Sequence, residues 1–263
     1  MAATPTLTSP LRAFSRRLGR IREVALIAVT GTNRQWQAQL ADEVVFWDEY
    51  LASGGLEWKD EFRQRLDPEL PLQQEFTAII DARPGSTVRV LDVGAGPLTV
   101  VGKKWAGRKI EIAAVDPLAV EYDRLLSKHG IRPVCRTTYA RAEGLTDIFP
   151  AAGFDFVHAR NSIDHSSDPI RAISEMLRVV KPGCWVYLEH KINEGRAENY
   201  HGLHQWNFFP RAGEFFIAGR GRFAINVSAR FRNVAETQAE RKDDSWFVVC
   251  MKKRSASEAV VRL

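Results

Sequence analysis

The chain has 263 residues, of which 45% are hydrophobic and 26% are charged, as is ordinary for a soluble globular protein. This length accommodates one catalytic domain with additions. No apolar run reaches the roughly 20 residues that a membrane-spanning helix needs, which argues against an integral membrane protein. We therefore expect a cytoplasmic protein without a secretory signal.

The N-terminal segment, residues 1–33, is basic. Residues 1–35 contain six arginines and one glutamate, which account for the whole net charge of +5, so the rest of the chain is balanced. Within residues 11–29, apolar side chains recur at helical spacing between the arginines, which predicts a short amphipathic helix after about ten disordered residues. This helix either packs its apolar stripe on the core or makes weak contact with an anionic surface such as the inner membrane.

Residues 34–82 are expected to form a helical cap ahead of the first strand. An aromatic stripe that includes Trp47 and Tyr50 precedes Gly54-Gly55, where we expect the first cap helix to end. Such aromatic side chains either pack on the edge of the sheet or line a substrate pocket. The two roles are compatible, because a cap must also pack.

The most informative motif is Val90-Leu91-Asp92-Val93-Gly94-Ala95-Gly96-Pro97, which predicts a buried strand that enters a glycine turn. Gly94 and Gly96 lack Cβ, so the backbone can turn sharply and a ligand can approach it closely. A second predicted strand, residues 110–115, leads to Asp116, whose carboxylate can accept hydrogen bonds from both hydroxyls of a ribose. The pattern indicates a nucleotide-type site at the carboxyl end of the first strand.

Two residues distinguish this turn from a dinucleotide-binding turn. Thr99 stands where a dinucleotide fingerprint has its third glycine. Pro97 stiffens the turn and removes a backbone donor that a pyrophosphate would use. The turn therefore suits an adenosine group without a phosphate bridge better than NAD, although a Rossmann-type NAD-dependent oxidoreductase remains an alternative.

Residues 90–99 resemble motif I of the class I S-adenosylmethionine (SAM)-dependent methyltransferases. Four further segments resemble the next motifs of this family in order: residues 113–118, 139–145, 154–161 and 181–189. The resemblance covers residues 87–190 and implies a Rossmann-like α/β fold, SAM as methyl donor and S-adenosylhomocysteine as product. A non-catalytic SAM-binding protein is the other alternative. The implied cofactor contacts are Asp92, Gly94, Ala95, Gly96, Asp116, Pro117, Leu118, Ala142, Glu143, Arg160 and Asn161.

The SAM-binding domain is expected to span residues 83–253, followed by a tail at 254–263. Predicted strands lie near residues 87–93, 110–115, 132–137, 154–159 and 184–189, with helices between them. Residues 169–180 form the clearest helix, with Asp168 as its cap, Pro169 in its first turn and Pro182-Gly183 as its end. Two later strands, residues 223–227 and 245–251, would close the sheet as an antiparallel pair. We therefore predict a mostly parallel seven-stranded sheet with helices on both faces.

The three cysteines, Cys135, Cys184 and Cys250, all fall in predicted strands and are expected to be buried in a reducing compartment. No cysteine or histidine spacing indicates zinc, so we expect no metal. A nucleic-acid substrate is disfavoured, because no basic, aromatic-rich cluster accompanies the motifs.

The acceptor side of the reaction is less well defined. The enzyme mainly aligns nucleophile, methyl group and sulfur, and a hydroxyl acceptor would also need a general base, usually histidine. His165 and His190 are the candidates, because each follows a predicted strand, and Asp164 can orient an imidazole. We expect a small-molecule or glycan acceptor, methylated on oxygen or nitrogen. The expected acceptor-lining residues are Trp47, Tyr50, His201, His204, Gln205 and Trp206.

Overall fold

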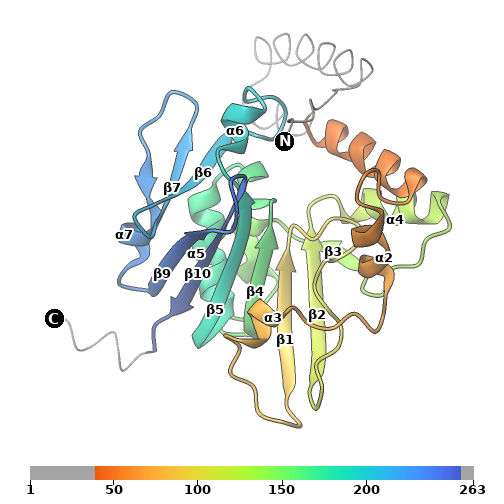
Figure 1. The fold of residues 1–263 in the computed structure, drawn as a ribbon, viewed down its shortest axis with the longest axis horizontal. Coiled ribbons are helices and arrows are strands. Elements are labelled where there is room, and N and C mark those ends of the chain that lie inside the picture. The colour runs from red at the N-terminus through yellow and green to blue at the C-terminus, as the bar shows by residue number, and fades with distance from the viewer. Residues whose placement is uncertain (1–38, 256–263) are drawn as a thin grey trace, which may run out of the picture.

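The structure is a computed structural model that describes residues 39–255 (Figure 1). The predicted disordered start, the amphipathic helix within residues 11–29 and all but the first two residues of the predicted tail lie outside the described residues. Within the described part, no helix is long and apolar enough to cross a membrane.

A seven-stranded sheet forms the centre of the molecule, in the order β3-β2-β1-β4-β5-β10-β9 (Figure 1). All neighbouring pairs from β3 to β5 are parallel, and β10 alone runs antiparallel to its neighbours. The predicted mostly parallel sheet of seven strands is confirmed. Strand order reverses between β1 and β4, where α/β sheets of this kind bind their ligands. The strands are β1 (Thr87–Val93), β2 (Lys109–Asp116), β3 (Thr137–Tyr139), β4 (Phe154–Arg160), β5 (Val180–Lys191), β9 (Ala235–Arg241) and β10 (Trp246–Lys253).

Side chains of the sheet alternate between two apolar cores, because successive residues of a strand point to opposite faces. In β1, Val90 packs in the core that contains Phe76 of α3 (Gln74–Thr77), whereas Leu91 packs in the core beneath α5 (Pro169–Val179). Helices therefore cover both faces, as predicted. A third cluster joins the helix of residues 39–53 to α4 (Ala119–Lys128). The other helices are α2 (Lys59–Leu66), α6 (Glu194–Ala197), α7 (Val227–Phe231) and the 3-10 turns η1 (Ala142–Asp147) and η2 (Ile163–His165).

Helix α5 begins as its sequence predicts but ends earlier than expected. Asp168 Oδ1 accepts a hydrogen bond from Arg171 N (3.0 Å), which satisfies one of the free donors of the first turn. The helix ends at Val179, and Val180 already pairs with Phe154 of β4. The prediction that Pro182-Gly183 terminates the helix is wrong, because both residues lie within β5.

The third strand is also displaced from its predicted position. It begins at Thr137, which pairs with Ala114 of β2, and not at residue 132. Pro133, which has no N–H to donate to a ladder, lies in the segment that we expected to be a strand. Cys135 consequently lies outside any strand, and its Sγ contacts Ile112 O at 3.4 Å. Cys184 and Cys250 lie in β5 and β10 as predicted, and all three thiols are half-buried.

The strand predicted at residues 223–227 does not belong to the main sheet. Its residues form the short β8 (Ile225–Asn226) and the start of α7. With β6 (Trp206–Arg211) and β7 (Glu214–Gly219), β8 builds a separate three-stranded sheet. The true partner of β10 is the edge strand β9, where only Ala235 and Ala239 are buried. Its polar, charged sequence carries little of the apolar alternation that signals a strand.

Candidate cofactor and acceptor site

The glycine turn lies at the carboxyl end of β1. Gly94 and Gly96 adopt φ values of +68° and +65°, a left-handed conformation that other L-residues rarely take. The N–H groups of Gly94 and Ala95 both donate to Val115 O, at 2.8 and 3.1 Å. This pins the turn to the end of β2. A Cβ atom on Gly96 would lie 2.7 Å from Cζ2 of Trp47, so the cap helix packs directly on the turn.

Asp116 ends β2 beside this turn. Its carboxylate accepts hydrogen bonds from Gly96 N (3.2 Å) and Leu118 N (2.9 Å). Burial raises the pKa of Asp116 to about 6, although both backbone donors act in the opposite direction. A hydrogen bond with the Tyr122 side chain also favours the ionised carboxylate. Ala95 and Leu118 are buried beside it, and Pro117 is half-buried.

Asp92, near the end of β1, is hydrogen-bonded to residues on both sides of the glycine turn's base: His158 of β4 and Thr99 after the turn. Its Oδ1 lies 2.7 Å from His158 Nδ1, and its Oδ2 accepts a hydrogen bond from the Thr99 hydroxyl (2.5 Å). The Thr99 oxygen in turn accepts from Val101 N (3.1 Å). Because both carboxylate oxygens have partners within the chain, the geometry favours a positioning role for Asp92 over direct contact with a ligand.

Glu143 lies in η1, next to the half-buried Ala142. Its Oε1 accepts hydrogen bonds from Ser167 N (2.8 Å) and Ser167 Oγ (2.7 Å). Burial alone would raise the pKa of Glu143, but these hydrogen bonds and the nearby Arg141 bring it below its ordinary value. Glu143 thus ties η1 to the loop before α5, and its contact with an adenine stays a prediction.

Arg160 is the last residue of β4 and Asn161 follows it, and the two side chains have different partners. Arg160 Nη1 donates to Glu61 Oε2 of α2 (2.9 Å), so it ties the cap to the sheet. Asn161 adopts φ +46°, and its Oδ1 accepts from Lys191 N (3.1 Å). This residue turns the chain away from β4 and into η2.

Trp47 and Tyr50 both lie at the glycine turn. Their rings meet edge to face at 5.2 Å, and the Arg65 guanidinium lies 5.8 Å from each ring centroid. Tyr50 is buried, and its hydroxyl has no hydrogen-bond partner within residues 39–255. A buried hydroxyl without a partner is costly, and it marks a place where a ligand group would be accepted.

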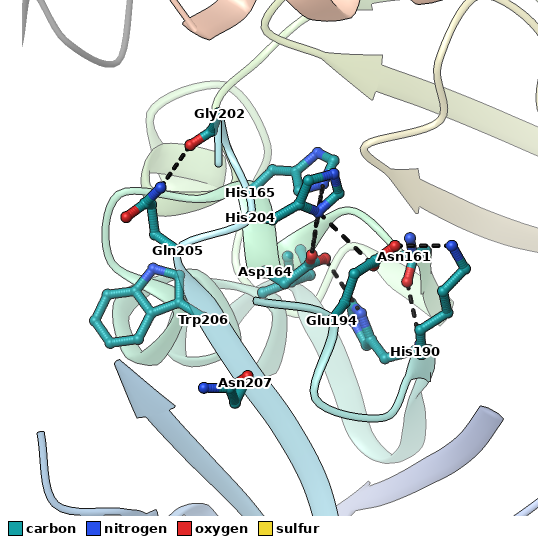
Figure 2. A network of polar contacts seen from close by, with 12 residues as sticks. Asn161, Asp164, His165, His190, Glu194, Gly202, His204, Gln205, Trp206 and Asn207 are labelled. Carbon is teal, nitrogen blue, oxygen red and sulfur yellow. Dashed lines mark hydrogen bonds and ion pairs between the residues drawn. The ribbon is translucent and has the colours of Figure 1, made fainter. Parts of the chain in front are cut away.

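A second polar group lies at the carboxyl ends of β4 and β5 (Figure 2). Asp164 and His165 come from η2, His190 from the end of β5, and His204 from the loop before β6. His165 Nε2 and His204 Nδ1 are 3.0 Å apart. Asp164 Oδ2 lies 3.5 Å from the first nitrogen and 3.6 Å from the second, and Asp164 Oδ1 lies 3.4 Å from His190 Nδ1. The structure thus brings both predicted base candidates into one cluster around Asp164.

Charge is concentrated in this cluster. Asp164 is 2% exposed; burial alone would raise its pKa, but the imidazoles of His165, His190 and His204 hold the pKa well below its usual range. Burial also opposes protonation of His204, yet Asp164 and the nearby Glu194 raise its pKa to about 9. The carboxylates therefore favour the protonated form of the His204 imidazole.

Ser162 connects the cluster to the glycine turn. Its hydroxyl donates to Val93 O (3.0 Å) at the end of β1. Its Cβ packs so closely on Gly94 that no side chain would fit there. Since His165 follows three residues later, the cluster stands next to the turn. Neither Ser162 nor Glu194 was predicted, because no motif or spacing in the sequence marks them.

The remaining predicted acceptor residues brace the loop that carries His204 (Figure 2). Trp206 Nε1 donates to Ser166 O (3.0 Å). Gln205 Nε2 donates to the carbonyls of Tyr200 and Gly202, at 2.9 and 2.6 Å. The backbone N–H of His201 donates to Glu198 O at 3.0 Å. Of the predicted set on this loop, His204 alone belongs to the cluster around Asp164.

The strand order, the glycine turn and the acidic residue after β2 define the protein as a class I SAM-dependent methyltransferase. Residues 34–217 match the family model described as a methyltransferase domain, and the chain belongs to this family. The predicted enzyme class is therefore confirmed, and the assignment displaces the NAD-dependent oxidoreductase alternative.

Comparison with curated proteins finds C-methyltransferases. The chain is 35% identical over 137 residues to the ubiquinone/menaquinone biosynthesis C-methyltransferase UbiE of Cupriavidus necator, covering 50% of this chain and 54% of that protein. It is 31% identical over 149 residues to UbiE of Cupriavidus metallidurans, covering 54% and 59% respectively. The chain thus spans little more than half the length of the curated relatives that it matches.

Solved structures with a similar fold include methyltransferases. The CurJ carbon methyltransferase shares 14% identity at a TM-score of 0.49, covering 68% of this chain and 51% of that chain. A SAM-dependent methyltransferase from Aquifex aeolicus shares 16% identity at a TM-score of 0.42, covering 72% and 90%. At this level the likeness concerns the fold alone.

Proposed function

We propose that the protein transfers a methyl group from SAM to an oxygen or nitrogen atom of a small-molecule or glycan acceptor. The cofactor part rests on the fit of the site. The left-handed glycine turn allows close approach of a ligand to the backbone. Asp116 presents a buried carboxylate at the end of β2, beside the glycine turn, where it would accept hydrogen bonds from two ribose hydroxyls.

The bound cofactor would supply an electrophilic methyl group on a sulfonium, so no covalent enzyme intermediate is needed. The chain's own contribution is alignment and exclusion of water. Trp47 packs on the glycine turn, and Tyr50 leaves its buried hydroxyl without a partner in the described part of the chain. These two residues would cover the cofactor and border the acceptor, as their sequence positions predict.

One observation supports this position for the acceptor: the contact of Ser162 with Gly94 sets the cluster of Asp164, His165 and His204 beside the cofactor turn. An acceptor hydroxyl between the two would face the methyl group on one side and the cluster on the other. Drawing the proton from this hydroxyl makes its oxygen a better nucleophile. His165 and His190 keep their proposed roles in this activation.

Methylation at carbon is a second candidate, because both curated relatives are named C-methyltransferases. A phenol that loses its hydroxyl proton becomes nucleophilic at the neighbouring ring carbons. The same cluster would therefore serve either product. Analysis of the methylated product separates the two, since a C-methyl product keeps its free hydroxyl.

The first experiment is calorimetric titration of the purified chain with S-adenosylhomocysteine, with NAD as control. We expect binding of S-adenosylhomocysteine alone. At a hundredfold excess over Kd it would stabilise the fold by about 2.7 kcal/mol, which corresponds to roughly 5–10 °C in Tm for a chain of this size. Failure to bind S-adenosylhomocysteine would overturn the proposal. Binding would justify an acceptor screen with methyl-labelled SAM, in which His165→Asn should lower kcat and leave S-adenosylhomocysteine binding intact.

A further inference from the structure

The contacts of Asp164 differ from those of other histidine–aspartate pairs in the molecule. His158 and Asp92 meet at 2.7 Å, and so do His129 and Asp48. Asp164 is almost fully buried among three imidazoles, yet its oxygens stay 3.4 to 3.6 Å from them. Such separations are too long for good hydrogen bonds. The carboxylate is therefore not held by short hydrogen bonds, although His165 Nε2 and His204 Nδ1 lie 3.0 Å apart.

The distances between three of these side-chain atoms match those between the ligands of a metal ion. His165 Nε2, His204 Nδ1 and Asp164 Oδ2 form a triangle with sides of 3.0, 3.5 and 3.6 Å. Adjacent ligands of a tetrahedral Zn²⁺ ion lie about 3.3 Å apart, since the bonds to nitrogen and oxygen are about 2.0–2.1 Å. The circle through the three atoms has a radius of about 2.0 Å, so an ion slightly above its plane makes three bonds of ordinary length.

We propose that Asp164, His165 and His204 bind one divalent transition-metal ion, with Zn²⁺ preferred, on the acceptor side of the site. Two imidazoles and one carboxylate form a ligand set that suits such ions and leaves a position open for another molecule. This proposal differs from the expectation of no metal drawn from the sequence, because His204 lies 39 residues after His165 and the set has no recognisable spacing.

Two neighbouring residues complete the arrangement. His190 Nδ1 faces the other oxygen of Asp164 (3.4 Å) and is itself packed on Phe208, with ring centroids 4.7 Å apart. With the ion bound, a slightly closer approach of His190 would orient the carboxylate, as partners of metal ligands do. Glu194 Oε1 accepts from Lys191 (2.8 Å), whereas the buried Oε2 has no hydrogen-bond partner among the described residues and lies 3.9 Å from His204 Nδ1. This oxygen is placed to bind the ion or a molecule on it (Figure 2).

The role of the ion rests on the proposed function, whereas its binding does not. An acceptor hydroxyl that binds at the open position would lose its proton to solvent more readily, because the ion stabilises the oxyanion. With the ion bound, His165 would activate the hydroxyl as a ligand of the ion and not as the base. The oxygen–methyl bond then forms as the sulfur–methyl bond breaks. The positive charge of the sulfonium is neutralised, and S-adenosylhomocysteine leaves.

The test is metal binding by the full chain, purified without a histidine tag. After treatment with EDTA and dialysis, the protein is titrated with Zn²⁺, with Mg²⁺ as a control for oxygen-only sites. We expect one equivalent of Zn²⁺ to bind with submicromolar Kd, and Co²⁺ to give the visible absorption of a tetrahedral site. His204→Asn and His165→Asn should each raise the Kd for Zn²⁺ by more than about 100-fold.

His129→Gln is the matched control, because His129 also faces an aspartate but has no second imidazole in its contact. It should keep the full equivalent of Zn²⁺. Absence of stoichiometric Zn²⁺ in the unaltered chain overturns the site, and so does full binding by both cluster variants. S-adenosylhomocysteine titrations on the same samples confirm that the variants are folded. They also separate the two proposals, since binding of Zn²⁺ without S-adenosylhomocysteine rejects the proposed function alone.

Discussion

Gly96 is the residue at which the cofactor turn and the cap meet. Its φ of +65° costs a residue with a side chain about 1–2 kcal/mol, and its missing Cβ leaves the space that Trp47 fills. Gly96→Ala therefore combines backbone strain with a collision against an aromatic ring. We expect this variant to bind S-adenosylhomocysteine at least about tenfold more weakly, equivalent to about 1.4 kcal/mol, as measured by calorimetry.

Gly130 provides the control for that substitution. It has the same φ of +65°, but nothing lies within 4 Å of a Cβ built there. Gly130→Ala should carry the backbone strain alone and lower Tm without changing the affinity for S-adenosylhomocysteine. Equal loss of affinity in both variants would mean that backbone strain, and not the fit at the turn, governs binding.

The raised pKa of Asp116 predicts that cofactor binding depends on pH. Its pKa is raised from 3.8 to about 6 by burial, so its contribution to folding stability is full below the unfolded pKa and is lost as pH rises through about 6. The affinity for the ligand changes with pH in the opposite direction to folding stability, because only the ionised carboxylate accepts hydrogen bonds from both ribose hydroxyls. Affinity for S-adenosylhomocysteine should therefore fall as pH drops from about 7 to about 5. Asp116→Asn should bind more weakly, with a flat profile. A variant that retained the slope would show that another group titrates.

The cofactor residues were predictable because they are local in sequence. Gly94 and Gly96 lie within three residues of the end of β1, and Asp116 is the last residue of β2, so strand and turn signals place them without knowledge of the fold. The cluster around Asp164 shows the limit of such reasoning. His165 and His190 were singled out for their positions at strand ends, but Glu194 and the approach of His204 depend on how the loop before β6 folds back over β5.

At the scale of elements, α2 is fastened to the sheet through Glu61. This carboxylate accepts from Arg65 on the same helix (2.7 Å) and from Arg160 at the end of β4 (2.9 Å). Burial alone would raise the pKa of Glu61, but the two guanidinium groups bring it below its ordinary value. The stability that Glu61 contributes is therefore present above its unfolded pKa and is lost as pH falls below it.

Removing this charge should loosen the cap. Glu61→Gln leaves two half-buried guanidinium groups near each other without their shared anion, and we expect a loss of about 1–2 kcal/mol in the free energy of unfolding. The control is Asp60→Asn on the same helix, whose partner Arg63 is exposed, so its effect should stay within about 0.5 kcal/mol. Urea denaturation at neutral pH measures both. Equal effects would show that α2 is not held through Arg160.

The elements that were predicted share a strong apolar signal, and the others do not. Strands β1 and β4 and helix α5 bury most of their side chains, and β2 buries its last three residues, so apolar period and capping define these elements. Strand β9 is an edge strand of the main sheet and is mostly polar and exposed. Strands β6 and β7 carry buried aromatic side chains such as Phe208 and Phe215 but form a separate sheet. Antiparallel pairing of β9 with β10 and of β6 with β7, more than a regular apolar period, makes these segments strands.

On the scale of the whole molecule, charge is divided unevenly along the chain. Residues 1–35 hold the entire net charge of +5, and the rest is balanced. Arginines near an anionic surface contribute about 1 kcal/mol each, and the apolar positions within residues 11–29 would add to the attraction. The full chain should therefore co-sediment weakly with vesicles that contain anionic lipid, and salt should release it because exposed charges are screened.

A chain that lacks residues 1–33 tests this expectation, because the match to the methyltransferase family begins at residue 34. The deletion removes five arginines and one glutamate, which lowers the net charge from +5 to +1. Vesicle binding should disappear while the affinity for S-adenosylhomocysteine stays the same. The alternative outcome is that the full chain does not bind vesicles and that the chain without residues 1–33 has a lower Tm and a lower cofactor affinity. This outcome would mean that the apolar stripe packs on the catalytic body. The arginines would then be its solvated face.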